Sequence, residues 1–281
     1  HPRHGIMNID VLSFERLAHR VFSEVGGEHR KILEDTGKSL VLRKLAEEKK
    51  DELTLLEGNL RKLGYISEVK SLLSEFVQYR IEPEDLTQIM EQNKSNPQLY
   101  FKLKDMKVIY ESFRQYLKDT YLTAEELLKA LEDTVEQSRS VRNSVIVLDG
   151  YHGFTPIQLG LIGRLLTLTD ELYVTMTLDH REEPFQMEAE HQLFYATKKT
   201  IQDLKKVAEQ TGVEIRKPIM LGKDKIWRYK DAPALRFLEE HIYRHSRRFW
   251  NEKTDAVTLF AARTPRSEVE CISREILKLV R

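Results

Sequence analysis

The fold class is decided by the stretch Val145-Ile146-Val147-Leu148-Asp149-Gly150-Tyr151-His152-Gly153-Phe154-Thr155-Pro156-Ile157-Gln158. Its first four residues are an apolar run without alternation, which predicts a strand buried on both faces, as in a parallel sheet. Asp149 stands at the carboxyl end of that strand, where open α/β sheets hold their ligands. Thr155 and Pro156 suit the cap and first position of a helix. The stretch therefore predicts a strand, an acidic tip, a short loop and a helix.

The same layout is typical of a Walker B segment, in which the aspartate holds the Mg²⁺ of a bound nucleotide. Helicases of the UvrD/RecB type carry Asp-Glu-Tyr/Phe-Gln-Asp at this point. Here Asp149 keeps its place, but Gly150 replaces the glutamate that positions the attacking water. Glycine has no side chain that could orient a water molecule or take a proton. We therefore predict no catalytic residue here, and interpret Asp149 as a Walker B relic that serves as a strand-end residue.

Composition limits the classes of function. Lys and Arg together number 45, as do Asp and Glu, so the formal net charge is +0. This balance argues against binding nucleic acid by bulk charge, although a local basic groove remains compatible with it. Cys271 is the single cysteine, which excludes a disulfide framework, a zinc cluster or an all-cysteine iron–sulfur site within the chain. With no membrane-spanning run or signal peptide pattern, we expect a cytoplasmic location and no membrane partner.

Helical spacing dominates residues 36–138, with no convincing strand, which predicts an all-helical region. After the Asp149 strand, a second core strand is expected at Glu171–Leu178 and a helix at Glu188–Gln210. Ala256–Ala261 reads as a third strand. Thr264 and Pro265 then open a last helix, and we expect its apolar stripe to face inward. The members of that stripe are Val269, Ile272, Ile276 and Leu279.

Near the start of the chain, Ser13, Phe14 and Arg16 are candidates for contact with single-stranded DNA. They would supply a phosphate hydrogen bond, base stacking and a charge contact respectively. The alternative makes Ser13 a helix cap and places Phe14 on the apolar face of that helix. Arg16 lies off the apolar face and is the better DNA candidate.

Two further groups are DNA-binding candidates. Tyr151 and His152 stand in an aromatic loop at the carboxyl end of the predicted sheet, where stacking on exposed rings is worth about 1–3 kcal/mol per base. Anchoring of the loop to the core is the alternative for both. Arg263 and Arg266 flank the opening of the last helix, whose backbone N–H groups favour phosphate. For these two, ordinary surface solvation is the alternative. No metal site is predicted.

Four ordered islands resemble UvrD/RecB-type helicases and, more closely, the B subunits of AddAB-type helicase–nucleases. The islands are Val11-Leu12-Ser13-Phe14-Glu15-Arg16-Leu17-Ala18, Ile81-Glu82-Pro83-Glu84-Asp85-Leu86, Leu148-Asp149-Gly150-Tyr151-His152-Gly153-Phe154-Thr155-Pro156 and Ala261-Ala262-Arg263-x-x-Arg266-x-Glu268-Val269-Glu270. The resemblance spans nearly the whole chain, which opens on His1 and reads as a piece of a longer protein.

The resemblance implies a partial RecA-like, P-loop NTPase-type parallel sheet of the α/β class, interrupted by an all-helical subdomain. It implies four parts. They are residues 1–30 as the first part of a helicase-like domain 1A, 31–140 as a 1B-like helical insertion, 141–254 as the remainder of 1A, and 255–281 as the start of a 2A-like region.

The resemblance also implies a heterodimer with an A subunit that processes DNA double-strand breaks for recombination. The A subunit would supply the motor and one nuclease. The B subunit would carry degenerate helicase domains, take part in reading the regulatory Chi sequence and end in a nuclease domain with an iron–sulfur cluster. The Gly-rich phosphate loop, cluster cysteines and nuclease carboxylates are absent from this sequence. We therefore expect no cofactor, ATPase or nuclease in this chain, while ATP with Mg²⁺ and the iron–sulfur cluster belong to the whole protein.

The function expected is single-stranded DNA binding and subunit assembly in such a complex. The alternative is a protein-interaction scaffold that holds the A subunit and never touches DNA. The retained Arg16, Arg263 and Arg266 favour DNA contact, whereas the zero net charge favours the scaffold.

Overall fold

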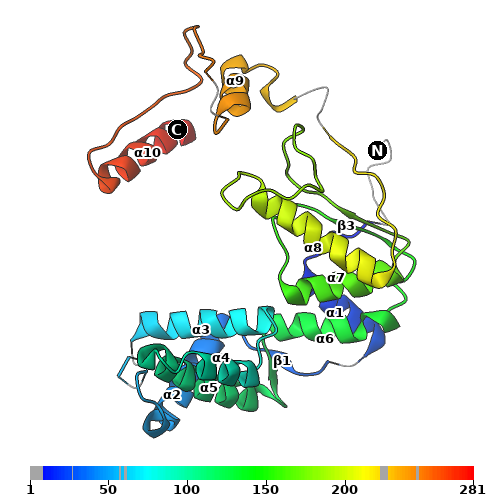
Figure 1. Cartoon of the computed structure of the whole chain (residues 1–281), viewed down its shortest axis with the longest axis vertical. Helices are drawn as coiled ribbons and strands as arrows, with labels where there is room; N and C mark the ends of the chain where they lie inside the picture. Colours follow the sequence, from blue (N-terminus) through cyan, green and yellow to red (C-terminus); the bar gives the residue numbers. More distant parts are fainter. Residues whose placement is uncertain (1–8, 27, 57, 60–61, 222–226, 245–246) are drawn as a thin grey trace. The chain divides into compact units, whose positions relative to one another are not determined.

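The computed structural model describes all residues except 1–8, 27, 57, 60–61, 222–226 and 245–246. The chain divides into two units, His1–Lys217 and Pro218–Arg281. The helices of the first unit (Figure 1) are α1 (Phe14–Val25), α2 (Asp35–Glu48), α3 (Leu63–Gln78), α4 (Pro83–Gln92), α5 (Pro97–Leu117), α6 (Ala124–Thr134), α7 (Pro156–Leu168) and α8 (Tyr195–Thr211), with 3₁₀ turns at Lys50–Glu52 and Val135–Gln137. Its strands are β1 (Lys31–Ile32), β2 (Tyr121–Leu122), β3 (Val145–Leu148) and β4 (Glu171–Val174).

Helices α2 to α5 surround one apolar core, as the helical spacing of this region predicts. Buried residues from α2, α3 and α5 fill it, among them Leu42, Ile66 and Ile109, each at most 1% exposed. Asp105 of α5 lies within this layer at 0% exposure, and its carboxylate accepts hydrogen bonds from the backbone N–H groups of Thr54, Leu55 and Leu56. These bonds satisfy the buried carboxylate and hold residues 54–56, which precede α3, against α5.

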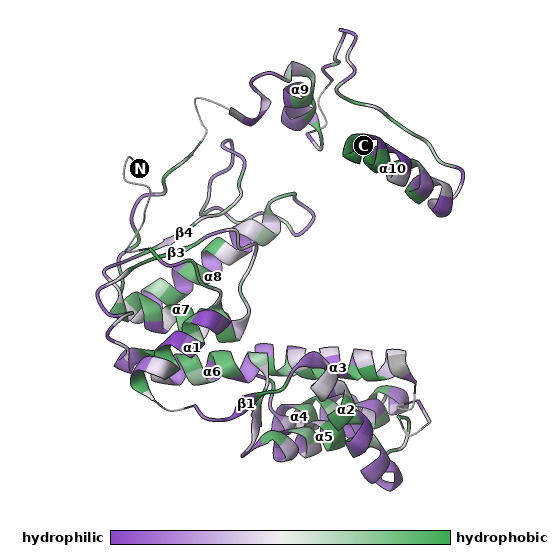
Figure 2. Ribbon diagram, turned by 180° about the vertical axis from the view of Figure 1, so that it is seen from behind, coloured by the Kyte–Doolittle hydropathy of each residue, from purple (hydrophilic) through white to green (hydrophobic). Residues whose placement is uncertain are grey.

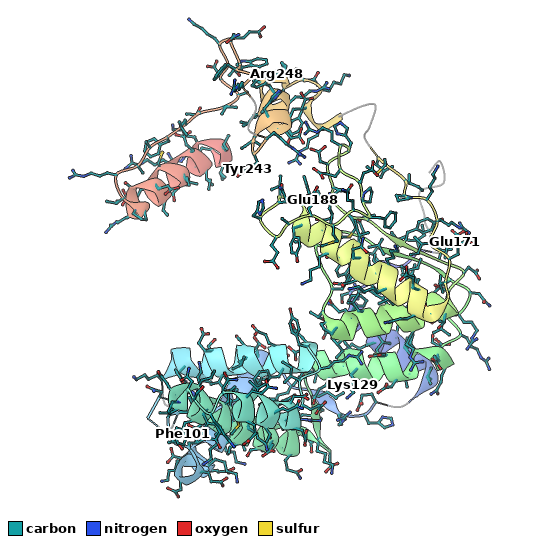
Figure 3. The ribbon with its side chains drawn as sticks, viewed as in Figure 1. Phe101, Lys129, Glu171, Glu188, Tyr243 and Arg248 are labelled. Carbon is teal, nitrogen blue, oxygen red and sulfur yellow. The ribbon has the colours of Figure 1, made fainter. Side chains whose placement is uncertain are left out.

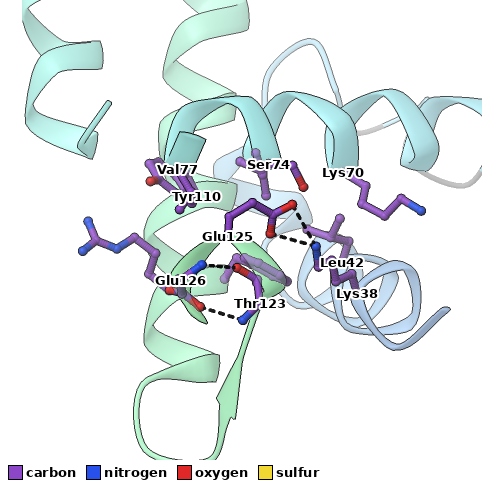
Figure 4. Close-up of a pocket in the computed structure, with 12 residues that line it drawn as sticks. Lys38, Leu42, Lys70, Ser74, Val77, Tyr110, Thr123, Glu125 and Glu126 are labelled. Atoms are coloured by element: carbon purple, nitrogen blue, oxygen red, sulfur yellow. Dashed lines mark hydrogen bonds and ion pairs between the residues drawn. The ribbon is translucent and has the colours of Figure 1, made fainter. Parts of the chain in front are cut away.

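A second apolar core joins α1, α6 and α7 to the inner face of the β3–β4 sheet. Leu131, Leu161 and Leu165 are each 0% exposed at its centre. Most of α7 is apolar (green in Figure 2), which suits a helix that packs on several neighbours. The two cores are linked where Lys38 of α2 donates to Glu125 of α6 at 3.0 Å (Figure 4).

The predicted insertion is not wholly helical. β1 and β2 pair in parallel, with Lys31 opposite Tyr121 and Ile32 opposite Leu122. β1 directly precedes α2 and β2 directly follows α5, so the pair brings together the chain segments that lead into and out of the helical layer. A hydropathy pattern cannot reveal a two-residue pairing of this kind, because period-two alternation needs a longer run.

β3 and β4 form the predicted parallel pair, in a register that places Val145 opposite Glu171 and Leu148 opposite Val174. The prediction that β3 is buried on both faces is wrong for the described residues. Leu148 is 6% exposed, but Val145 and Val147 are 59% and 57% exposed. Side chains alternate across a strand, so these two valines share the outer face, which no element of the described residues covers.

The second unit contains a 3₁₀ turn (Trp227–Tyr229) and the helices α9 (Pro233–His241) and α10 (Pro265–Val280). The expected strand at 256–261 is irregular, and Leu259 there is 97% exposed. The expected inward stripe of α10 is also exposed, with Val269 at 63% and Ile276 at 54%. Both predictions failed for one reason: a strand needs a pairing partner and an apolar stripe needs a packing surface, and the described residues of this unit provide neither.

Candidate functional site

The candidate site lies at the carboxyl ends of β3 and β4. Since the two strands are parallel, the loops that follow them, 149–155 and 175–194, leave the sheet at the same end. Thr175 connects them: its hydroxyl donates to the Asp149 carboxylate at 2.5 Å and accepts from the Gly150 N–H at 3.2 Å. Asp149 is thus hydrogen-bonded to the neighbouring strand end, as a structural role for this residue requires.

Gly150 adopts φ +78°, a region that residues with a side chain rarely adopt. No other group lies within 4 Å of the position that a Cβ would take there. The backbone itself, and not crowding, therefore favours glycine at this position.

An aromatic cluster joins this loop to the start of α1. The Tyr151 ring lies 5.6 Å from the ring of Phe14 and 5.0 Å from that of Phe154, measured between ring centroids. All three side chains are half-buried, and burial raises the pKa of Tyr151. Tyr151 therefore anchors the loop to the start of α1, although the two segments are far apart in the sequence.

His152 has the opposite environment. It is exposed, and its backbone carbonyl accepts a hydrogen bond from the Thr200 hydroxyl of α8 at 3.3 Å. The same hydroxyl donates to the Ala196 carbonyl at 2.9 Å, so the His152 backbone lies against α8 through a shared hydrogen bond while the residue remains exposed. An exposed ring on a fixed backbone can meet a ligand at little entropic cost.

Ser13 and Arg16 differ in how they are used. The Ser13 hydroxyl accepts from the Arg16 N–H at 3.3 Å and caps α1, so the helix-cap interpretation is confirmed. Arg16 is exposed, and no carboxylate among the described residues forms an ion pair with its guanidinium. Whether either side chain contacts DNA stays a prediction.

Arg263 and Arg266 lie in the second unit, at the start of α10. Both are exposed, and Arg266 donates to Glu270 at 3.1 Å. Thr264 caps the helix by accepting from the Ser267 N–H at 3.2 Å. The Glu270 contact partly neutralises one of the two cations that the sequence offers here.

The loops are fixed by residues that the sequence did not single out. Thr175 and Thr200 reach Asp149 and the His152 carbonyl across 26 and 48 positions. Lys198 of α8, 1% exposed, forms ion pairs with Glu182 and Glu188. No local pattern marks a threonine or a lysine for such a role, because the partners are set by the fold.

A cavity of about 180 Å³ lies beside α1. Its lining residues are His19, Phe22, Ser23, Glu28, His29, Arg30, Ile32 and Leu127. Hydrogen bonds from Arg30 lower the pKa of Glu28, so the cavity wall carries a matched ion pair and not a net charge.

Metal and nucleotide chemistry find little support in the residues present. In the part of the chain that the structure describes, no three His, Cys, Asp or Glu side chains are grouped so as to hold a metal ion. Asp149 already accepts from Thr175, and Cys271 stands on α10. A single cysteine does not suffice for an all-cysteine iron–sulfur site. None of the described helices combines the length and apolar character needed to span a bilayer.

Comparison with known proteins identifies the family. Residues 1–239 match the family model described as ADDB, N-terminal. The chain is 38% identical to the B subunit of the ATP-dependent helicase/deoxyribonuclease of Lachnoclostridium phytofermentans, over 100% of this chain and 25% of the relative. It is 34% identical to the protein of the same name from Caldanaerobacter subterraneus subsp. tengcongensis, over 98% of this chain and 23% of the relative. The chain thus spans about a quarter of the length of these relatives. Matched along most of its length, it belongs to the AddB family and corresponds to that family's N-terminal region.

Proposed function

We propose that this chain is a non-catalytic, single-stranded-DNA-binding part of a helicase–nuclease subunit. The observation that carries the proposal is the ring contact between Phe14 and Tyr151. It unites the start of α1 with the loop at the carboxyl end of β3. Exposed Arg16 and exposed His152 each stand within two residues of this contact.

The chemistry of this surface suits a single strand. An exposed guanidinium binds a phosphate, and an exposed imidazole stacks on a base or hydrogen-bonds to its edge. Phosphate contact gives affinity without sequence information, whereas base contact allows one sequence to be preferred. We extend the proposal to the reading of a regulatory Chi sequence within double-strand-break repair by homologous recombination, with His152 among the residues that contact bases.

The finer fold assignment is also a proposal. A two-stranded parallel sheet with exposed Val145 and Val147 is incomplete by the rule that parallel sheets are covered on both faces. We propose that β3 and β4 belong to a RecA-like sheet of a degenerate helicase domain. The positive φ of Gly150 supports loss of the motor chemistry. ATP with Mg²⁺ and an iron–sulfur cluster would then be held by other parts of the longer protein.

The test is the affinity for fluorescein-labelled single-stranded DNA, measured by anisotropy across a salt series. Arg16→Ala is compared with Arg43→Ala, since both arginines are exposed and neither forms an ion pair among the described residues. Arg43 lies on α2, away from the aromatic cluster. We expect salt-dependent binding by the unmodified chain, and a logarithmic salt slope reduced by about 1 in Arg16→Ala only. Equal effects of the two variants would contradict the proposal.

A second candidate function is a scaffold for the A subunit without DNA contact. The observation that favours it is the exposed outer face of the sheet, where Val145, Val147 and Tyr173 are 59%, 57% and 40% exposed. The relatives are named as one subunit of their enzyme, which implies another. If the chain binds no DNA at low salt but binds the A subunit, and Val147→Asp abolishes that binding, the scaffold is the better account.

A further inference from the structure

The loop after β4 is long for a connection. Residues 175–194 contain no helix or strand, although the structure describes all of them. Irregular loops longer than about 12–15 residues are uncommon in compact domains, and those that are ordered usually serve binding or catalysis. This loop lies at the carboxyl end of the sheet, as does the loop of residues 149–155, which carries Tyr151 and His152.

A buried lysine holds the loop in place. The Lys198 ammonium of α8 donates to Glu182 at 2.8 Å and lies 2.7 Å from Glu188, both in the loop. Burial disfavours the charged lysine, but the two carboxylates outweigh this effect and raise the pKa of Lys198. Figure 3 labels Glu188 beside one end of α8, and both glutamates lie in the loop that follows the carboxyl end of β4. A buried ion pair often contributes little net stability, whereas its two short contacts hold the loop against α8 in one geometry.

The same helix positions both loops. Gln202 donates to the backbone carbonyl of Phe185 at 2.6 Å, and Thr200 donates to that of His152 at 3.3 Å. The Thr200 hydroxyl also donates to the Ala196 carbonyl at 2.9 Å, so the Gln202 bond is the stronger of the two loop contacts made by α8. The loop after β4 exposes three apolar side chains: Phe185 is 41% exposed, Met187 42% and Leu193 57%.

We propose that residues 179–194 form the second side of the single-strand surface, that the Phe185 ring stacks on a base, and that Lys198 is the positioning residue. The proposal rests on the proposed DNA-binding function and adds to it a contact and a device that fixes the contact. A phenyl ring suits a base of any sequence, because every base offers a π-face. Phe185 thus supplies affinity for the DNA strand through stacking, while Arg16 supplies the phosphate contact.

The direct test replaces the ring. Phe185→Ala is compared with Phe101→Ala, an aromatic residue of similar exposure, 37%, on α5 of the helical layer (labelled in Figure 3). By anisotropy with an oligothymidylate, Phe185→Ala should bind about 5- to 150-fold more weakly, the range expected for the loss of one stacked base. Phe101→Ala should bind as the unmodified chain does. Both side chains are partly exposed, so neither change should unfold the protein.

The positioning role is tested by a cycle. Lys198→Met should weaken binding in the unmodified chain but have little further effect when combined with Phe185→Ala, because the lysine acts through the ring. A general loss of structure would weaken binding in both backgrounds. Because Lys198→Met leaves two carboxylates without their cation, a second variant adds Glu182→Gln and Glu188→Gln. It should melt near the unmodified temperature and still bind weakly.

The outcomes separate the two proposals. If the unmodified chain binds no single-stranded DNA, the proposed function fails. If it binds and Arg16→Ala weakens binding, but Phe185→Ala binds like Phe101→Ala, this inference alone is overturned. If additionally Phe185→Ala impairs binding of the A subunit, the exposed apolar side chains of the loop serve a protein partner.

Discussion

Glu24 shows how a single residue fixes the chain around the candidate site. Its carboxylate, at the last turn of α1, accepts from the Ser140 and Ser138 hydroxyls, each at 2.7 Å, and from the Arg139 N–H at 2.5 Å. These bonds, led by that from Ser140, hold the pKa of Glu24 at about 2, below its ordinary value of 4.5. The helix that carries Arg16 is thereby fastened to the segment that leads into β3.

We predict a pH-dependent effect of Glu24→Gln. The folded-state pKa lies below the unfolded one, so the carboxylate stabilises the fold fully above pH 4.5 and loses this contribution as the pH falls toward 2. The variant should therefore be less stable at pH 7, and the difference should shrink below pH 4.5. Urea unfolding between pH 7 and 3 measures it. A difference that is constant with pH would contradict the assignment.

At Gly150 the prediction concerns backbone strain. Gly150→Ala should lower the free energy of unfolding by about 1–2 kcal/mol, because φ is +78° and nothing else crowds the site. Gly153→Ala is the control in the same loop, since its φ is not positive and its Cβ would stand 3.6 Å from the Thr200 hydroxyl, an ordinary contact. Equal unfolding midpoints in urea for Gly150→Ala and the unmodified chain would refute this account.

Single residues also mark how far the sequence predicted the site. Exposed Arg16 and the Ser13 cap were predicted because both depend on helical periodicity and on neighbours three residues away. The contact of Tyr151 with Phe14 could not be predicted, because it depends on the packing of α1 beside the sheet. Buried Lys198 was also missed, because a lysine within a helix pattern normally faces solvent.

Among the elements, α7 and the β3–β4 pair follow from local patterns, whereas the start of α8 does not. A helix was expected from Glu188, but α8 begins at Tyr195. Glu188 instead lies in the loop and forms an ion pair with Lys198 of α8, a long-range contact that a local pattern does not show. The exposed outer face of β3 was missed for another reason. An apolar run predicts that a strand is covered on both faces, but it does not identify the segment that covers it.

The contact between α2 and α6 carries a prediction about the two cores. Lys38 and Glu125 have side chains only 6% and 14% exposed, and the adjoining cavity of about 10 Å³ has room for about one water molecule (Figure 4). Lys38→Met should therefore cost about 3 kcal/mol, because Glu125 would be left buried without its cation. Adding Glu125→Gln should recover much of this loss.

Lys44→Met is the matched control on α2. The Lys44 side chain is 55% exposed, 3.8 Å from Glu48 and 5.1 Å from the centroid of the Tyr116 ring, so its loss should change the free energy of unfolding by at most about 1 kcal/mol. Urea denaturation of the four proteins completes the comparison. If Lys38→Met proves as mild as Lys44→Met, the pair does not join the two cores.

At the scale of the whole molecule, the two units differ in how their apolar residues are used. In α7, Ile157, Leu161 and Leu165 are at most 1% exposed, whereas Val269, Ile272 and Ile276 of α10 are 53% exposed or more. A helix of 16 residues without tertiary packing is marginal in water. We predict that amides of α10 exchange with deuterium far faster than those of α7. Equal protection of the two helices would contradict this prediction.

The measurement that tests the central claim most directly is a photo-crosslinking map. Single-stranded DNA with bromodeoxyuridine at one position is irradiated with the chain, and the crosslinked peptides are identified by mass spectrometry. The account predicts crosslinks in residues 13–19 and 149–155, where Phe14 and Tyr151 bring the two segments together. They should disappear at high salt, because phosphate contacts contribute to affinity. Crosslinks confined to the helical layer formed by α2 to α5, or none at low salt, would contradict it.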